Sequence, residues 1–407
     1  MYEIYVRDQY FNRVAEVTDY QQLDLIPKFN SPGSWVLDIP TDCEAAKELI
    51  KPKAGIIVKR NGKTILSGPR TQPKRRWDSN GDQLTISGYD DLVHLQRNYA
   101  SPVPHGPPYT SQAYDIRTGK AETVMKAYLT DNIGINGRSE RKINNLLVEV
   151  DKGLGNTVTG RARFHNFIEL FTSLALSGGD LGFRVVQVGK NLEFQVYTPS
   201  DKTNEVFFSP LLGNLSEFEY TVDDPECNYV IVGGGGEGTD RILLEKGNNT
   251  SIAKYGRIES FVDRRDTTDI KELEQAMNEE LTQKAEKTSL SISPIDTESI
   301  AFGRDYNLGD KVSVLITQPN EVVDIETLHY FISAYQTIPV DVERVRRIQE
   351  KLEVIKDVVR EIKITITPNG ENISPVIGTP DSLAHPLLGI FDKMKKITRR
   401  INNLERR

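Results

Sequence analysis

The sequence predicts a mainly β fold with an α+β insert. It should contain two β-barrel-like domains, an α+β middle domain and a C-terminal amphipathic helix. Residues 216–266 alternate short runs rich in Val, Ile, Tyr and Phe with clusters of Gly, Asp, Asn and Pro, which is typical of antiparallel strands joined by tight turns. Within residues 101–215 the apolar period changes to that of amphipathic helices. Residues 387–404 carry a heptad pattern of apolar side chains.

We expect four domains, because 407 residues are enough for several hydrophobic cores. They are a first β-barrel domain at 1–100, an α+β insert domain at 101–215, a second β-barrel domain at 216–380 with a charged helical insertion within 318–361, and a C-terminal helix at 381–407. The run SPVPHGPPYTSQ, with four prolines, separates the first two as a linker or crossover loop.

The first domain is predicted to consist of short strands joined by turns. Asn61–Gly62 between two apolar runs is the strongest hairpin signal, and Pro69 and Pro73 favour a sheet edge. A short helix should follow with Asp90 as its N-cap. The expected strands are 1–6, 13–17, 22–26, 34–39, 55–60, 63–67, 74–78 and 83–88.

The insert domain should hold two amphipathic helices and a hairpin. Residues 120–130 and 164–176 place their apolar side chains on one helical face. Residues 182–188 and 192–198 then alternate as two strands around a glycine turn.

The second barrel should begin with antiparallel strands, because no helix long enough for a crossover was expected between them. A helix at 269–287, with Asp269 as N-cap, should dock one apolar face on the barrel. A charged segment at 341–361 has an apolar seam typical of a helix. The expected strands are 218–222, 229–232, 242–245, 258–262, 290–293, 311–317, 326–337 and 362–368.

The C-terminal seam is the predicted site of oligomerisation or partner docking. Its steps of three and four residues describe a helix of about two and a half heptads, too short to be stable without a partner. Two interpretations stay open, since the helix could pair with identical tails or dock another partner. The seam residues are Leu387, Ile390, Met394, Ile397, Ile401 and Leu404.

Composition excludes several classes of function. The formal charge of −7 argues against a nucleic-acid binder, which needs concentrated Lys and Arg. Cys43 and Cys227 form neither a disulfide framework nor a metal-ligand spacing, so we expect synthesis in a reducing cytoplasm. No apolar run is long enough to cross a bilayer, and Met1 leads straight into YEIYVRD without a signal peptide.

No catalytic, cofactor-binding or metal-binding residue is predicted. Gly233, Gly235 and Gly238 match G-x-G-x-x-G, but the following TDRILLEKG is strand-like, so a glycine hairpin is favoured over a dinucleotide site. The run Asp263–Arg264–Arg265–Asp266 is interpreted as structural ion pairs. The five histidines show no HExxH spacing, and no G-x-S-x-G elbow occurs. Basic clusters such as Lys74–Arg76 are interpreted as solvated loop faces.

Six blocks in order resemble the tail-tip (baseplate) hub proteins of long-tailed siphophages. The resemblance covers roughly residues 1–340, and no matching pattern follows it. The blocks are YEIYVRD, KFNSPGSWVLDIP, RFHNFIELFTSLALSGGDLGFRV, NYVIVGGGGEGTDR, GRIESFVDRRDTTD and FGRDYNLGDKVSVLI.

The resemblance implies a non-enzymatic virion protein without a cofactor, assembled in the host cytoplasm. Hubs similar to this chain are trimers whose paired β-barrel domains present a pseudo-sixfold surface to the tail tube. The implied partners are two further copies, a distal tail or tail tube protein, the tape measure protein, and a distal fibre or receptor-binding protein. DNA would only pass through the lumen, past an acidic wall. The alternatives are a tail-associated cell-wall hydrolase and a carbohydrate-binding adhesin.

Overall fold

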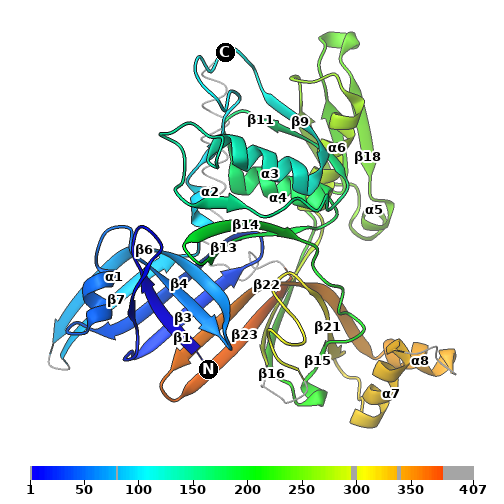
Figure 1. Cartoon of the computed structure of the whole chain (residues 1–407). Helices are drawn as coiled ribbons and strands as arrows, with labels where there is room; N and C mark the ends of the chain where they lie inside the picture. Colours follow the sequence, from blue (N-terminus) through cyan, green and yellow to red (C-terminus); the bar gives the residue numbers. More distant parts are fainter. Residues whose placement is uncertain (1, 79–80, 295–299, 337–340, 379–407) are drawn as a thin grey trace.

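The computed structural model describes residues 2–78, 81–294, 300–336 and 341–378. Strands from the two ends of the chain lie side by side in the lower part of the molecule (Figure 1), with the middle of the chain above them. The fold is mainly β, as predicted, with a smaller share of helix.

Residues 2–89 form the first half of a large sheet. In the strands Gln22–Lys28, Ser31–Pro40 and Gly81–Tyr89, buried side chains alternate with less buried ones, as with Trp35 and Leu37 beside Asp38, so that one face covers a core. The Asn61–Gly62 turn joins β5 to β6 as predicted. The strands are β1 (Tyr2–Arg7), β2 (Arg13–Glu16), β3 (Gln22–Lys28), β4 (Ser31–Pro40), β5 (Gly55–Arg60), β6 (Lys63–Asp78) and β7 (Gly81–Tyr89).

Two features of this half differ from expectation. The strands expected on either side of Pro69 and Pro73 are one continuous strand, β6, because a shift in its register with β7 accommodates the prolines. A helix that was not predicted, α1 (Glu44–Leu49), follows β4 and buries Leu49 in the core of the sheet. The sulfur of Cys43 caps α1 by accepting a hydrogen bond from the amide of Ala46.

The C-terminal half of the chain completes the same sheet. Strand β22 pairs with β3, and the resulting 13-stranded sheet follows the order β16-β20-β23-β22-β3-β4-β7-β6-β5-β1-β2, with β21 and β15 branching from β22. The two predicted barrel-like halves therefore share one sheet and one apolar core. Among the described residues, the strand pairings form no closed barrel. The added strands are β15 (Phe207–Phe208), β16 (Leu215–Asp223), β20 (Lys287–Pro294), β21 (Lys311–Thr317), β22 (Leu352–Thr367) and β23 (Gly370–Gly378).

Two predicted elements in this half were wrong. A strand was expected over 326–337, but the described residues of that range belong to the helix α7 (Ile325–Gln336). The helix expected over 341–361 ends early, because α8 spans Val342–Gln349 and β22 begins at Leu352. Residues 352–359 are rich in Val and Ile, which favour strands, and pairing with β21 decides in favour of the strand. Helices α7 and α8 nevertheless form the expected helical insertion within 318–361.

The middle of the chain forms a separate α+β unit, as predicted. Both expected helices are present, and α4 packs Phe167 and Phe171 against Phe183 and Phe194 of the β13–β14 hairpin. Its elements are α2 (Val93–Gln96), β8 (Tyr99–Ala100), β9 (Asp115–Lys120), α3 (Ala121–Asn132), β10 (Leu146–Val148), β11 (Thr157–Ala162), β12 (His165–Asn166), α4 (Phe167–Ser177), β13 (Gly182–Val188) and β14 (Asn191–Tyr197).

Residues 224–286 form a small unit inserted between β16 and β20, which pair directly with each other. This corrects the expectation that its strands belong to the second barrel. They form their own sheet, and β17 and β19 run parallel because the helix α5 supplies part of a crossover. Its elements are β17 (Tyr229–Gly233), η2 (Gly238–Asp240), β18 (Leu243–Gly247), α5 (Asn249–Tyr255), β19 (Glu259–Asp263) and α6 (Ile270–Gln283). Asp269 caps α6, as predicted.

A buried polar network holds the middle unit on the large sheet. Arg7 and Asp91 are both almost fully buried, and Asp91 accepts hydrogen bonds from Arg7 Nη1 at 2.9 Å and from Ser67 Oγ at 2.6 Å. Gln187 of β13 accepts a bond from Arg7 Nη1 at 2.7 Å. Burial alone would raise the pKa of Asp91, but the Arg7 guanidinium outweighs it and holds that pKa below its usual value. The ion pair therefore joins β1, β6 and β13.

We expect Arg7→Met to lower the free energy of unfolding by about 3–5 kcal/mol, because it leaves the buried Asp91 carboxylate unpaired. Arg7→Met/Asp91→Leu should recover most of the loss in denaturant titrations. Because the pKa of Asp91 is lowered in the folded state, its contribution is present above a pH of about 4 and is lost as the pH falls through the folded pKa. Arg13→Met, at an exposed site, is the control. Equal stability of Arg7→Met and the wild type would contradict this role.

Candidate functional site: the polar face of the large sheet

The large sheet has one apolar and one polar face. Across the strands β22, β3, β4 and β7, the side chains that alternate with the core residues are mostly hydroxyls, amides and a few charges, with Ile26 and Val36 among them. Cross-strand pairs such as Asp24↔Thr365 and Asp38↔Thr85 place them side by side. We call this surface the polar face. It comprises Gln22, Asp24, Ser34, Asp38, Gln83, Thr85, Ser87, Lys363, Thr365 and Thr367.

The carboxylates of the polar face are held by neighbouring donors. Asp38 accepts from Thr85 Oγ1 at 2.5 Å, and Asp24 accepts from Thr365 Oγ1 and from Gln22 Nε2, each at 2.7 Å. The two threonine bonds cross from strand to strand, and the Gln22 bond runs along β3, so together they fix the carboxylates on the sheet. The result is a wide surface of satisfied polar groups with little free charge.

A glycine lets the strands pack closely beneath this face. A Cβ at Gly88 would lie 2.3 Å from the carbonyl oxygen of Pro69 and 2.4 Å from the ring of Trp35. The fully buried Trp35 therefore lies directly against β7, and its indole donates a hydrogen bond to the carbonyl of Tyr89 at 3.2 Å. The polar face is supported by a close-packed core.

A cavity of about 580 Å³ separates the middle unit from the small unit. Arg161 of β11 crosses it, with Nη1 2.8 Å from Glu272 Oε2 and Nη2 3.3 Å from Asp266 Oδ2. Its guanidinium also stacks on the ring of Tyr114. Burial lowers the pKa of His165, so this lining residue is neutral near neutral pH. The charged groups in the cavity mostly pair with one another, which suits a joint between two units.

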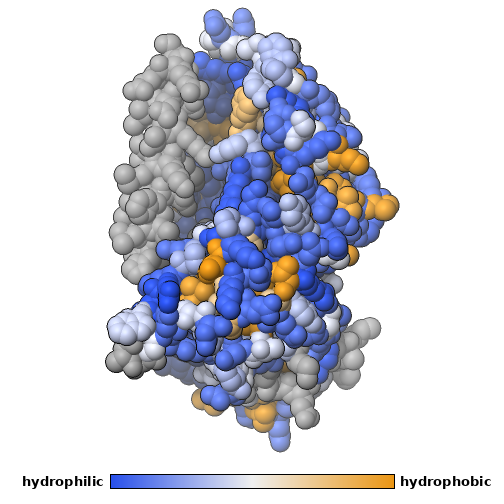
Figure 2. All heavy atoms as spheres, turned by 60° about the vertical axis from the view of Figure 1, so that its left-hand side comes forward, coloured by the Kyte–Doolittle hydropathy of each residue, from blue (hydrophilic) through white to orange (hydrophobic). Residues whose placement is uncertain are grey.

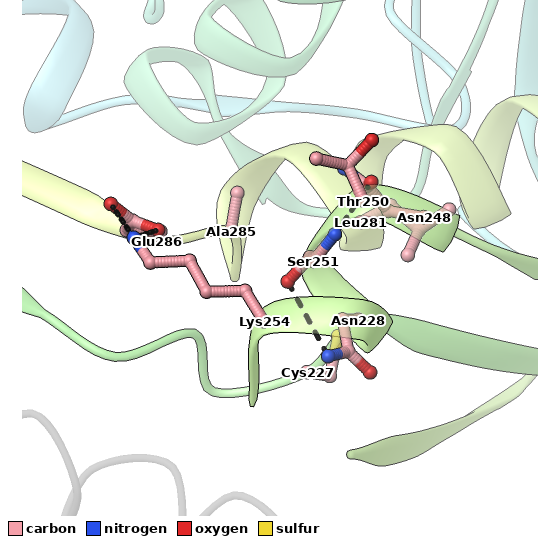
Figure 3. A pocket seen from close by; sticks show the side chains of 9 residues that line it. All are labelled: Cys227, Asn228, Asn248, Thr250, Ser251, Lys254, Leu281, Ala285 and Glu286. Carbon is pink, nitrogen blue, oxygen red and sulfur yellow. Dashed lines mark hydrogen bonds and ion pairs between the residues drawn. The ribbon is translucent and has the colours of Figure 1, made fainter. Parts of the chain in front are cut away.

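A smaller cavity of about 200 Å³ lies between α5 and α6 (Figure 3). Lys254 and Glu286 form an ion pair at 2.9 Å beside it. Asn228 donates to the carbonyl of Gly256 at 2.7 Å and accepts from the amide of Ile258 at 2.8 Å. Burial raises the pKa of the Cys227 thiol, which makes it a poor nucleophile. The polar side chains that line this cavity therefore form bonds within the small unit and stabilise it.

The residues singled out in the sequence lie apart from one another. Gly233 ends β17, and the loop through η2 turns back into β18, so the glycine motif is a hairpin, as predicted. Arg264 pairs with Asp266, and Arg265 with Asp263, each at 3.4 Å, as expected of structural ion pairs. Among the described residues, no group of three or more His, Cys, Asp or Glu is placed to hold a metal ion.

The predicted heptad seam cannot be compared with the fold. All six seam residues, from Leu387 to Leu404, lie outside the described residues, so their role stays a prediction. The polar face, by contrast, was not predicted. Its signal was present as Ser, Thr, Gln and Asp alternating with apolar residues at 22–26, 34–39 and 83–88. The sequence did not show that these strands share one surface with β22.

Three solved structures share this fold at low sequence identity. The 43 kDa tail protein of prophage MuSo2 from Shewanella oneidensis has a TM-score of 0.55 and 12% identity, covering 94% of this chain and 100% of that one. The tail protein from Neisseria meningitidis MC58 has a TM-score of 0.53 and 11% identity, covering 93% and 96%. Prophage tail protein gp18 from Listeria monocytogenes EGD-e has a TM-score of 0.51 and 12% identity, covering 98% and 99%.

A family model also matches most of the chain. The model, described as "Siphovirus ReqiPepy6 Gp37-like protein", matches residues 3–337. No curated protein matches this sequence. The matched range ends within the helical insertion, near the point where the sequence resemblance to siphophage proteins also ends.

Arg161→Met should loosen the small unit, because it leaves Glu272 and Asp266 without their partner across the cavity. We expect faster hydrogen–deuterium exchange in α6 and unchanged exchange in α3. Arg184→Met is the matched control, since Arg184 bonds only within the β13–β14 hairpin at Gln195. Unchanged exchange in α6 would show that Arg161 does not hold this joint.

Proposed function

The chain belongs to the siphovirus ReqiPepy6 Gp37-like family of phage tail proteins, and we propose that it is the structural hub of the tail tip. In this role three copies form a ring that joins the tail tube to distal receptor-binding or fibre components. The ring surrounds the channel through which DNA leaves. The hub position, the trimer and roles in host attachment and genome ejection are the proposed part.

The polar face is the observation that carries this proposal. A channel wall for DNA should expose few unpaired Lys and Arg, because each cation that neutralises a phosphate adds to non-specific binding. Over β3, β4 and β7 the hydroxyls and amides of the polar face, with Asp24 and Asp38 held by neighbours, meet this requirement. The face also carries Lys363 on β22 and, at its β6 edge, Lys74 and Arg76. The continuous sheet also supplies a long wall from one chain, since both halves contribute to it.

A closed ring would cover the two end strands of the sheet, each of which has a neighbour on one side alone among the described strands. Strands β2 and β16 stand at the two ends of the sheet order. Unpaired edges are a hazard that assembly can cover, and three head-to-tail contacts would close a three-fold ring. The seam residues 387–404 would then gather three chains or dock a distal protein. The proposed neighbours are a distal tail or tail tube protein, the tape measure protein and a distal fibre or receptor-binding protein.

The proposed location is the virion, at the tail tip, after assembly in the host cytoplasm. Within the described part of the chain, no helix is long and apolar enough to span a membrane. We propose that the protein acts without catalysis, as a structural member of its family. The alternatives are a cell-wall hydrolase, which a zymogram on cell walls would detect, and a carbohydrate-binding adhesin, which a glycan array would detect.

The purified protein should have the mass of a trimer in light scattering, alone or with a tail tube component. Ile397→Asp/Ile401→Asp should lower the trimer fraction or abolish attachment of the distal component, because both changes place charge in the apolar seam. Thr398→Asp, between the seam positions, is the control. Unchanged mass together with intact attachment would show that the seam has neither role.

Thr85→Lys/Ser87→Lys should create salt-sensitive binding of double-stranded DNA, whereas the wild type should bind little in mobility-shift assays. The two lysines would place cations on the polar face, and the binding should weaken steeply between low and physiological salt. Val322→Lys/Val342→Lys adds the same charge at exposed positions of the helical insertion and should bind less. Strong DNA binding by the wild type would contradict a low-friction channel wall.

A further inference from the structure

The outer half of β6 is one free edge of the large sheet. The last pair between β5 and β6 is Gly55↔Pro69, and beyond it β6 pairs only with β7. The side chains from Thr71 to Trp77 are all exposed, and Trp77 is 79% exposed. Lys74 makes no ion pair with any residue in the described ranges. Lys74, Arg75 and Arg76 follow one another here, and because Arg75 is paired with Asp82, Lys74 and Arg76 supply the positive charge of this edge.

Strand β16 is a second free edge, and it stands at one end of the strand order of the large sheet. It pairs only with β20, and most of its side chains are exposed. Glu217, Glu219 and Asp223 form no ion pair with the rest of the described chain, and Asp224 follows directly. Unpaired carboxylates make this edge negative. Two free edges of one sheet therefore carry opposite charge.

The two edges also match face by face. Lys74 pairs in register with Thr85 and Arg76 with Gln83, so both lie on the polar face. Glu219 pairs with Ser291, Ser291 with Val376, and Val376 with Glu361, two residues before Lys363 of the polar face. Glu219, and Glu217 two residues before it, therefore lie on that same face.

The opposite face of each edge carries exposed apolar side chains, and on β6 it also carries Arg75, the partner of Asp82. Phe218 pairs with the buried Ile292 and is 40% exposed, and Val222, on the same side of β16, is 38% exposed. Trp77 alternates with Arg76 and therefore lies on the core side of β6. A strand-to-strand contact would thus place carboxylates beside cations on one face and exposed apolar side chains together on the other.

We propose that β16 of one copy lies beside the outer half of β6 of the next copy. This inference rests on the ring proposed above and identifies the surface through which neighbouring copies would close it. The second copy is favoured as occupant because the two edges are complementary in charge and in apolar content and continue the same sheet. Head-to-tail contacts of this kind use different patches on each subunit and close when the rotation permits. Pro73 has no backbone N–H, so the backbone hydrogen bonds between the two strands are interrupted at this residue. The register of the contact is therefore set by the charged side chains.

Charge reversal tests the contact in the full-length chain. Glu217→Lys/Glu219→Lys and Lys74→Glu/Arg76→Glu should each raise the concentration needed for half-maximal trimer formation by about tenfold or more, because like charges then face each other. The chain with all four changes should recover trimer formation. Trimer formation by the wild type should weaken with salt. Glu237→Lys/Asp240→Lys, on the exposed glycine hairpin, is the control and should behave as the wild type.

A cysteine pair supplies a second measurement that does not depend on charge. Lys74→Cys/Glu219→Cys should give covalent dimers and closed trimers under oxidising conditions, whereas either single change should give no such ladder. Covalent dimers from a single change, or no product from the pair, would overturn the contact. If the wild type is a trimer and the charge-reversal variants form trimers equally well, the proposed contact is wrong, but the proposed ring is not contradicted. A wild type that is monomeric under all conditions would instead overturn the proposed ring.

Discussion

The pairing of β3 with β22 is the constraint on which the molecule depends. It brings Leu25 opposite Ile364 and Leu23 opposite Ile366, residues separated by almost the whole described chain. Both halves of the apolar core meet at this junction, and Lys28 and Glu361 form an ion pair across it at 2.8 Å. Closing so long a loop costs entropy, which only a large buried surface can offset.

The same pairing determines which surface is polar. Side chains alternate with a period of two, so a slip of one residue between β3 and β22 would bury Asp24 and Thr365 and expose their apolar neighbours. The cost of burying those groups fixes the register. It also keeps the polar face continuous from the first strands of the chain to the last. A surface of this extent could not be built from either half alone.

The other units are attached without disturbing this sheet. The small unit leaves at Asp223 and returns at Lys287, which are paired neighbours, so its insertion leaves the β16–β20 ladder intact. The middle unit rests on the buried Arg7–Asp91 pair and on Asn30 at the β3–β4 turn, whose side chain bonds the backbone of Phe183 at 2.8 Å. Directional polar contacts of this kind fix orientation more than they add stability.

The local elements followed from the sequence alone. Period and capping residues were enough for the helices α3, α4 and α6, for the β5–β6 and β13–β14 hairpins, and for the glycine hairpin after β17, because each depends on residues close in the chain. The boundaries of the four expected domains stay predictions. Tertiary structure alone decided that 352–361 is strand, that β17–β19 leave the large sheet, and that the two ends of the chain share one sheet. These outcomes depend on partners far away in sequence, and local propensity does not encode which strand lies alongside.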